Sequence, residues 1–521
     1  MEFQVPDVPL LKIFSFLDAF SLLQASQVNR CWNRVAENDH LWRNLCLKKW
    51  SFCNFSQCLG SLTWKQFFLK QRKQEYRMAL AKPEDFTFRE ASGNLGILGP
   101  MAYLSGNDHT VGGQEKSVIC TVSSKHVLCT WDVQEGTMIW SSPVQQSSIM
   151  HLATLPQMHL AFTVDLEGTV KVWNCQDEDA LATLAMPRVC FSLEICLTND
   201  GPFLMVGNSE GDIYTLTVPE LRGVSKVNAF KYSVDLLHCS PDRKWIFASG
   251  THQNILPMVF LTECLLKPSE GNSPLCLSIP FSSCCRACWA PRKTSRVTVM
   301  YRRGSFKKTG FTTFDLMAKR TGGRTDIQAH QVATFLLPVH MESPIWMGVG
   351  DGNMIVFESG PYLFLFTISG HLLQRFEDHQ RTISNLWVDS VHILTTSMDD
   401  SLHLYMWEDE GRYPYLKSCC HLEHIGSDLA PSCFQKFDVF DVDFFEFNLL
   451  GFDQLFHSFA KNTHIFVGVK FSIINYVPLS TDFVFSVGSY VSKAICDNMS
   501  IVCVVSRIRE SSILVMYSLH M

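Results

Sequence analysis

The residues best suited to bind a charged ligand lie in a basic segment, residues 292–324. This segment holds ten lysine and arginine residues against one acidic residue, Asp315, in a chain whose net charge is −6. A guanidinium can donate hydrogen bonds to two oxygens at once, so arginine clusters on a rigid scaffold are suited to bind phosphorylated protein motifs. A solvated basic loop without a ligand would have the same composition. The candidate ligand-binding residues are Arg292, Lys293, Arg302, Arg303, Lys307 and Lys308.

No motif for bond chemistry accompanies these cations. The sequence lacks G-x-S-x-G, H-E-x-x-H and a phosphate-binding glycine loop with its lysine, and its 18 histidines are scattered singly. The tightest cysteine group, Cys284, Cys285 and Cys288, has no second ligand pair nearby, which makes it weak evidence for zinc. The other cysteines are spread through apolar runs, as buried free thiols are. We expect no catalytic residues, no cofactor and no metal site.

A second polar constellation has the spacing of structural hydrogen bonds. His379 precedes Tyr405 in the sequence, and Ser397 and Asp399 lie between them. A buried histidine, a hydroxyl, a turn aspartate and an aromatic residue can bond in series across neighbouring strands. We expect these four residues to hold strands in register and to perform no chemistry.

Two kinds of sequence pattern predict the secondary structure that positions these residues. Residues 1–50 contain apolar residues at helical spacing, with capping residues such as Asp18 and Asn38 before successive stripes. A further amphipathic segment, residues 61–80, predicts a linker helix. From about residue 98, short alternating runs bounded by glycine, aspartate, asparagine and serine predict strands. These runs recur at intervals of about 40–50 residues, which is the period of four-stranded propeller blades.

The repeats predict seven blade-like units, beginning near residues 118, 149, 191, 234, 284, 331 and 382. The last strands of the chain form an eighth blade, or else they close the ring with the strand near residues 99–104. Closure matters because an open propeller exposes two strand edges. Residues 425–490 fit no blade well and form either an insertion or a degenerate blade.

The N-terminal segment resembles an F-box, the motif that docks onto the small adaptor subunit of cullin–RING ubiquitin ligases. The matching residues are Val5-Pro6-Asp7, the run from Leu10 to Leu17, Val28, Arg30, Trp32 and Leu41-Trp42. Pro9 stands where the family usually has leucine, and it is tolerable only in the first turn of a helix. The resemblance implies adaptor contacts for Pro6, Leu10, Leu11, Ile13, Phe14, Leu17, Leu22, Leu23, Val28, Trp32, Leu41 and Trp42.

The rest of the chain resembles WD repeats, most clearly in "TWDVQEG" (130–136) and "GTVKVWN" (168–174). The order of parts is that of F-box/WD-repeat proteins: a small all-α F-box over residues 1–50, linker helices over 51–97 and an all-β propeller of seven or eight blades over 98–521. The resemblance implies the substrate-recognition subunit of an SCF-type ligase, which is not itself an enzyme. The alternatives are an F-box scaffold, or a WD-repeat platform, that delivers no client for ubiquitination.

The apolar content of the N-terminal segment agrees with a partner-dependent role. About 45 residues cannot bury all of these side chains within themselves. Leu10, Leu11, Ile13, Phe14 and Leu17 are therefore expected to form an exposed patch that an adaptor covers. Packing of this patch on the propeller is the competing explanation.

Charge and hydropathy exclude other partners. A net charge of −6 and a pI near 6.3 provide no global field that attracts nucleic acid or an anionic membrane. The N-terminus lacks the features of a secretory signal, and no apolar run reaches the roughly 18 residues needed to span a bilayer. We expect an intracellular protein, cytoplasmic or nuclear and not secreted, that binds the adaptor with its cullin–RING core and a client protein of unknown identity.

Overall fold

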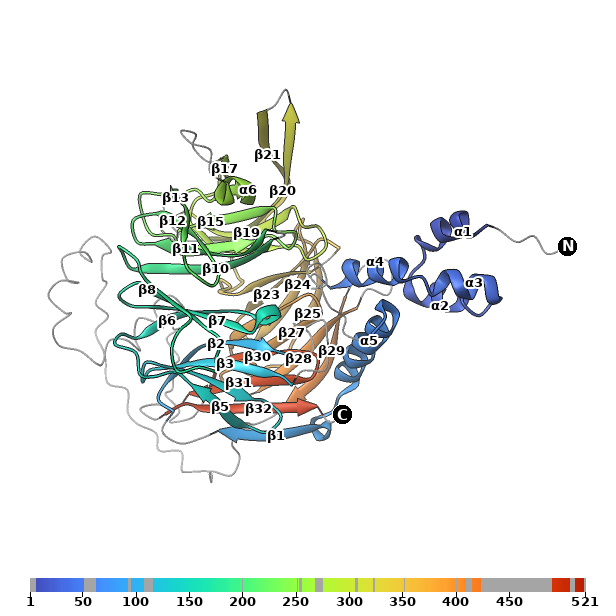
Figure 1. Ribbon diagram of the computed structural model, residues 1–521, viewed down its shortest axis with the longest axis horizontal. Coiled ribbons are helices and arrows are strands. Elements are labelled where there is room, and N and C mark those ends of the chain that lie inside the picture. Colours follow the sequence, from blue (N-terminus) through green and yellow to red (C-terminus); the bar gives the residue numbers. More distant parts are fainter. Residues whose placement is uncertain are drawn as a thin grey trace. The chain divides into compact units, whose positions relative to one another are not determined.

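A computed structural model describes residues 6–50, 62–91, 95–106, 116–198, 200–250, 252, 255–267, 275–304, 308–321, 324–350, 352–399, 401–408, 415–422, 490–506 and 511–519. The N-terminal part consists of helices and the remainder mostly of strands (Figure 1). The helices of the N-terminal part are α1 (Asp7–Phe14), α2 (Ala19–Ala25), α3 (Arg30–Ala36), α4 (Asp39–Lys49) and α5 (Trp64–Leu80). None of the described helices combines the length and the apolar character that crossing a membrane requires.

Side-chain caps begin most of these helices. Asp18 accepts a hydrogen bond from the backbone N–H of Ser21 at 2.7 Å, and Asn29 and Asn38 accept equivalent bonds at the starts of α3 and α4. Thr63 and Gln66 form a reciprocal capping box at the start of α5. Helix α1 begins at Asp7, so its proline falls in the first turn, where a missing N–H breaks no intrahelical bond.

The helices share one apolar core, which α5 completes. Trp42 donates its indole N–H to the carbonyl of Ala36 at 2.7 Å, and its ring packs edge-on against Phe68 at a centroid distance of 5.5 Å. Trp50 at the end of α4 packs against Phe68 as well and donates to the buried carboxylate of Glu75 at 2.6 Å. We name helices α1–α4, together with the part of α5 that packs on them, the helical domain.

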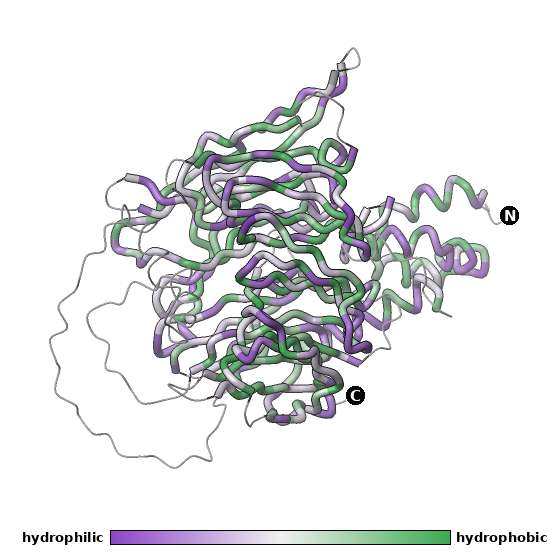
Figure 2. Tube along the Cα trace, turned by 60° about the vertical axis from the view of Figure 1, so that its left-hand side comes forward, coloured by the Kyte–Doolittle hydropathy of each residue, from purple (hydrophilic) through white to green (hydrophobic). Residues whose placement is uncertain are grey.

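The strands form eight four-stranded antiparallel sheets within the described residues, which are the blades of a β-propeller. The middle strands of the blades are buried at nearly every position, whereas most of the outermost strands are largely exposed, and the hydrophobic stretches recur along the tube in Figure 2. Blade 1 contains β2 (Leu98–Ser105), β3 (Val118–Ser123), β4 (Val127–Asp132) and β5 (Thr137–Ser141), and blade 2 contains β6 (Ile149–Leu155), β7 (Leu160–Asp165), β8 (Thr169–Trp173) and β9 (Ala182–Ala185). Blade 3 contains β10 (Cys190–Thr198), β11 (Gly201–Asn208), β12 (Asp212–Thr217) and β13 (Gly223–Asn228), and blade 4 contains β14 (Leu236–Cys239), β15 (Trp245–Ser249), β16 (Met258–Leu261) and β17 (Cys276–Ser278).

Blades 5 to 8 complete the ring, and short helices lie between strands or before them. Blade 5 contains β18 (Cys284–Trp289), β19 (Arg296–Arg303), β20 (Lys308–Thr321) and β21 (Arg324–Leu336), and blade 6 contains β22 (Met347–Gly350), β23 (Met354–Ser359), β24 (Tyr362–Thr367) and β25 (Leu372–Phe376). Blade 7 contains β26 (Ile383–Val388), β27 (His392–Ser397), β28 (Leu402–Glu408) and β29 (Tyr415–Leu422), and blade 8 contains β30 (Tyr490–Cys496), β31 (Ser500–Ser506), β32 (Ile513–Leu519) and β1 (Phe86–Ala91). The short helices are η2 (Pro83–Asp85), η3 (Pro156–Met158) and α6 (Thr262–Leu266).

The ring closes through a strand that precedes the first blade. Strand β1 pairs with β32, from Phe86 opposite Leu519 to Ala91 opposite Leu514. This pairing joins the two ends of the propeller, and β1 supplies the outermost strand of blade 8. The segment 51–97, expected to hold linker helices, therefore contributes helix α5 and also one propeller strand.

Two details differ from the expected repeat boundaries, and one expectation falls on residues that the structure does not describe. The strand near residues 99–104 begins blade 1 instead of closing the ring, so this blade starts at Leu98, well before the expected position of 118. Position 331 lies within β21, the last strand of blade 5, and blade 6 starts at Met347. Nearly all of the segment 425–490 lies outside the described residues.

The antiparallel order of strands defines two faces of the propeller. Turns between first and second strands lie on one face, and turns between second and third strands lie on the other, together with the connections between blades. Val391, in the β26–β27 turn, packs against the helical core, and Asn498, in the β30–β31 turn, places its Nδ2 3.5 Å from Gln71 Oε1 of α5. We name the face that carries these two turns the helix-side face, and the opposite one the far face.

Candidate functional site

The helical domain presents large apolar side chains to solvent although its own core is complete. Val8 and Phe16 are exposed by 79% and 77%, Phe20 by 69%, and Ile13 and Val28 by more than half. All five lie in the short segment that runs from Val8 to Val28. We name these five residues the exposed apolar group. A protein surface with this many large apolar residues in so short a segment is typical of a protein–protein contact.

Local turns direct these side chains outward. Helix α1 ends at Phe14, and two tight backbone bonds follow, from the N–H of Phe16 to Ile13 and from the N–H of Leu17 to Phe14. The chain reverses at this point, and Asp18 then caps α2. Phe16 therefore lies in the turn, Phe20 lies in the first turn of α2, and neither ring reaches the core.

The adaptor-contact residues expected from the sequence divide into three sets. Phe14 is 2% exposed and packs edge-on against Trp32 at a centroid distance of 5.4 Å, so it belongs to the core of the helical domain. The remaining expected residues are placed as follows: Leu10, Leu22, Leu41 and Trp42 are buried, Leu11, Leu17, Leu23 and Trp32 are half-buried, and Pro6, Ile13 and Val28 are exposed. The expectation that Leu10 and Phe14 form an exposed patch is wrong, because both side chains are buried in the apolar core of the helical domain, where α3 packs against α1.

Three exposed residues were absent from the expected set, namely Val8, Phe16 and Phe20. The spacing of Leu10, Ile13, Phe14 and Leu17 predicted one continuous helix through all four residues. Helix α1 is only 8 residues long and ends at Phe14. The signal that could have found them was the cap at Asp18, because a cap so soon after Phe14 implies that the helix has already ended.

The six candidate ligand-binding cations do not form one cluster. Arg292 and Lys293 lie in the β18–β19 turn, on the helix-side face. Arg302, Arg303 and Lys308 lie at the other end of β19, where Arg303 faces Lys308 across the β19–β20 hairpin. Lys307 lies outside the described residues. The two groups are separated by the length of an eight-residue strand, about 25 Å.

The far-face cations border a shallow pocket. Its volume is about 320 Å³, and it is lined by Lys308, Thr309, Leu337, Pro338, Val339, Met341 and Ser343. Lys308 is exposed at its edge, and Arg303 is exposed opposite Lys308 in the hairpin. Arg302 is instead held by the hydroxyl of Thr309 and by the carbonyl of Pro344 at 2.7 Å. The pocket thus combines an apolar wall with a cationic rim, and it can accept an apolar side chain next to a negative charge.

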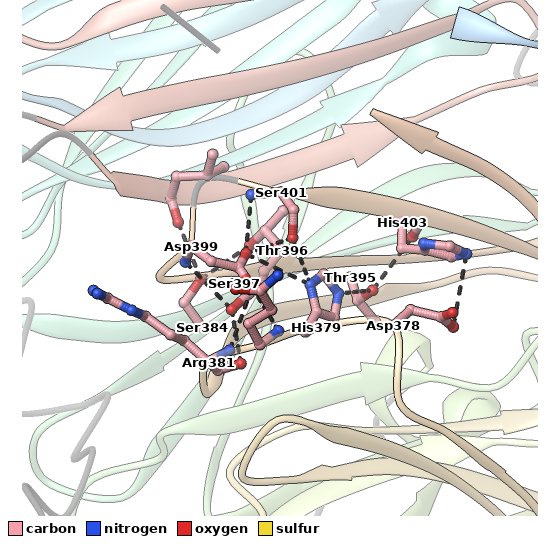
Figure 3. Close-up of polar contacts among 12 residues, drawn as sticks. Asp378, His379, Arg381, Ser384, Thr395, Thr396, Ser397, Asp399, Ser401 and His403 are labelled. Carbon is pink, nitrogen blue, oxygen red and sulfur yellow. Dashed lines mark hydrogen bonds and ion pairs between the residues drawn. The ribbon is translucent and has the colours of Figure 1, made fainter. Parts of the chain in front are cut away.

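The polar constellation of blade 7 forms a hydrogen-bond network around His379 (Figure 3). The Nδ1 atom of His379 lies 2.7 Å from the hydroxyl of Ser401, and its Nε2 atom lies 2.7 Å from the hydroxyl of Thr395. Ser401 bonds in turn to Asp399, whose other oxygen accepts the backbone N–H of Gln380 at 2.8 Å. Both ring nitrogens of His379 are therefore occupied by structural bonds that join the blade-to-blade connection to β27 and to the β27–β28 turn.

Two expected members of this network make their shortest bonds to other residues, although the hydroxyl of Ser397 also accepts the backbone N–H of Asp399 at 3.4 Å. Ser397 donates to the carbonyl of Arg381 at 2.8 Å, and Tyr405 donates to the carboxylate of Asp378 at 2.7 Å. Thr395 and Ser401 supply the hydroxyls that contact His379 instead. Burial and the hydrogen bond to Asp378 raise the pKa of Tyr405 above its usual value. Burial also raises the pKa of Asp399, but the bonds from His379, Ser401 and the backbone outweigh this effect and hold it well below its usual range.

Comparison with known proteins assigns both parts of the chain. An F-box-like family matches residues 3–48, which covers α1 to most of α4. The human F-box/WD repeat-containing protein 12 is 52% identical over 521 residues, covering 100% of both chains. The mouse F-box/WD repeat-containing protein 15 is 39% identical over 424 residues, covering 81% of this chain and 91% of the relative.

A third relative matches a much shorter stretch of the chain. The human F-box only protein 16 is 35% identical over 82 residues, which cover 16% of this chain and 27% of the relative. The similarity to the two F-box/WD repeat proteins instead extends over the blades, in agreement with the eight-bladed propeller. The chain therefore belongs to the family of F-box/WD repeat-containing proteins.

Proposed function

We propose that this protein is the substrate-recognition subunit of an SCF-type cullin–RING ubiquitin ligase. The helical domain binds the adaptor subunit, and the propeller captures the client protein. One observation supports this proposal most directly. The core of the F-box is already filled, and yet the exposed apolar group remains on its surface. The protein performs no bond chemistry itself, because the covalent steps belong to the partner enzymes, and it raises the concentration of a client lysine near them.

The exposed apolar group provides the energy for adaptor binding. Val8, Ile13, Phe16, Phe20 and Val28 are not needed for the core, so an adaptor can cover them without unfolding the domain. Burying one large apolar side chain contributes roughly 1.5–3 kcal/mol. Two exposed phenylalanines in such a group are suited to act as the few residues that dominate an interface.

The connection between helical domain and propeller supports transfer at a defined distance. The buried carboxylate of Glu75 on α5 accepts the indole N–H of Trp50 and forms ion pairs with Lys49 at 3.4 Å and Arg72 at 2.6 Å. Helix α5 then contacts β29, and η2 leads directly into β1. A joint packed in this way limits the positions that a bound client can take relative to the ligase.

The far-face pocket is the client-binding surface that we propose. It lies on the face opposite the one that contacts the helical domain, so a client there does not compete with the adaptor. Lys308 and Arg303 supply positive charge in a chain that is acidic overall. An acidic or phosphorylated segment with one bulky apolar residue fits this combination.

Adaptor binding is tested by charge insertion into the exposed apolar group. The double variant Ile13→Asp/Phe20→Asp of the full chain should lose the adaptor on co-purification, because both positions are exposed and an interface would have to bury the new carboxylates. The matched control is Val339→Asp, which places the same charge at an 80% exposed apolar residue of the propeller. Unchanged recovery of the adaptor with the double variant would refute this part of the proposal.

Client capture is tested by charge reversal on opposite faces. Proteins that accumulate with the wild-type chain under proteasome inhibition should be lost with Arg303→Glu/Lys308→Glu and retained with Arg292→Glu/Lys293→Glu. Equal retention by both variants would refute the proposed surface. Adaptor and cullin recovered without any accumulating client would favour an F-box scaffold, and recovery of neither would favour a WD-repeat platform.

A further inference from the structure

Three side chains of the kinds that bind transition metals meet between blades 7 and 8. They are Asp389 in the β26–β27 turn, His392 at the start of β27 and Cys496 at the end of β30. One ligand atom of each residue lies within 4.8 Å of the other two. The Nδ1 atom of His392 is 3.1 Å from Asp389 Oδ2. Cys496 lies far from the other two in the sequence, so only the fold brings the three together.

The turn holds the carboxylate in place before any metal binds. Asp389 Oδ1 accepts the backbone N–H groups of Val391 at 2.7 Å and His392 at 2.6 Å. These bonds leave Oδ2 directed at the imidazole. Metal sites depend on such outer contacts, because they orient the ligands and raise the affinity.

Burial and access are both suited to a bound ion. His392 and Cys496 are each 1% exposed, whereas the Asp389 side chain is 30% exposed. An ion can therefore enter past the carboxylate, and a water molecule can complete its coordination from the same side. Ligand atoms around tetrahedral zinc lie about 3.3–3.8 Å apart, given metal–ligand bonds of about 2.0–2.3 Å. The pair His392 Nδ1 and Asp389 Oδ2, at 3.1 Å, is already about this close, and the other ligand atoms need to approach by no more than about 1.5 Å.

The ligand types select the class of metal. A thiolate, an imidazole and a carboxylate match zinc and its analogue cobalt(II), whereas calcium and magnesium prefer oxygen ligands only. The thiolate and the carboxylate together neutralise a divalent cation, so the filled site places no net charge between the blades.

We propose that Asp389, His392 and Cys496, with a water molecule as the fourth ligand, form a zinc site that cross-links blades 7 and 8. The site lies on the helix-side face, in the same turn as Val391, which packs against the helical core. Zinc bound here stiffens the part of the ring that carries the helical domain. This inference concerns the propeller itself and does not depend on the proposed ligase function.

The experiment is cobalt titration of the full chain after removal of metal by a chelator. We expect one cobalt ion per chain, with the visible absorption of a tetrahedral site and a thiolate charge-transfer band in the near ultraviolet. The variants Cys496→Ser and His392→Gln should lose this spectrum or weaken binding at least tenfold. The matched control Cys503→Ser changes a buried cysteine of β31 in the same blade and should leave the spectrum intact.

The wild-type titration also decides the question if a variant fails to fold. Absence of a thiolate band in the wild-type chain would show that Asp389 and His392 form only a hydrogen bond, and it would overturn the proposal. A band that persists in Cys496→Ser, or that Cys503→Ser removes, would place the metal elsewhere and would overturn it as well. Zinc measured by elemental analysis in the chain as purified should equal about one ion per chain.

Discussion

The exposed apolar group leads to a quantitative prediction for one phenylalanine. In the variant Phe20→Ala, the ring at the start of α2 is removed without any change in charge. Phe20 is 69% exposed in the free protein, so most of its surface is still available for burial against an adaptor. Complete burial of a phenylalanine contributes roughly 1.5–3 kcal/mol, and about two thirds of this range is roughly 1–2 kcal/mol. At about 1.4 kcal/mol per tenfold change, the adaptor should bind about 5- to 30-fold more weakly.

A second phenylalanine separates binding from folding. Phe14 is 2% exposed and packs against Trp32, so Phe14→Ala leaves a cavity in the helical domain. Such truncations cost about 3–5 kcal/mol of folding free energy. Phe14→Ala should therefore accelerate hydrogen exchange throughout residues 7–50, whereas Phe20→Ala should leave exchange there unchanged, because substitutions at exposed sites usually alter stability by less than about 0.5 kcal/mol.

Two measurements on the full chain test this reasoning. Calorimetric titration with purified adaptor measures the change in affinity, and hydrogen exchange followed by mass spectrometry measures the local stability of residues 7–50. The reasoning is refuted if Phe20→Ala binds the adaptor with wild-type affinity. It is equally refuted if Phe14→Ala leaves the protection of residues 7–50 unchanged, since Phe14 would then not belong to the core.

Three further predictions concern buried polar groups. Thr395→Val removes the hydroxyl 2.7 Å from His379 Nε2 and should lower stability by about 1–3 kcal/mol in chemical denaturation. Glu75→Ala removes the acceptor 2.6 Å from Trp50 Nε1 and should lower the thermal midpoint of the helical domain, measured by tryptophan fluorescence. Burial raises the pKa of Glu358 from 4.5 to about 7. Between these two pH values the folded protein keeps the proton on Glu358, whereas the unfolded chain loses it. The free energy of unfolding of the wild-type protein therefore falls as the pH rises from about 4.5 to about 7. Glu358→Gln should therefore gain stability relative to wild type across this pH window, measured by thermal unfolding.

The N-terminal part shows how far local patterns reach. Caps at Asp18 and Asn38 and the apolar spacing between them predict the helices, because caps and helical periodicity act over a few residues. The same patterns placed Phe14 on the surface and did not include Phe20 in the contact set. Exposure depends on how α1, α3 and α4 pack together, which spacing within one helix does not contain.

The propeller shows the same limit over longer distances. The recurring strands predict blades, but the choice between seven and eight depended on β1, whose partner β32 lies near the opposite end of the chain. The strands of the β20–β21 hairpin are unusually long, with 14 and 13 residues. The repeat spacing therefore predicted a blade start at 331, which lies within β21, before the true start of blade 6 at Met347. A repeat pattern does not specify which strand joins the ends of the ring.

The sequence by itself determined the two-part architecture, the helices and the repeating strands, since these follow from periodicity, capping and turn residues within short segments. Only the tertiary structure decided which apolar residues face solvent and that the basic residues divide between two faces. It also decided that Thr395 and Ser401 contact His379, and that Asp389, His392 and Cys496 meet. The physical reason is that exposure and side-chain proximity depend on contacts between segments distant in sequence, which packing of the whole chain establishes.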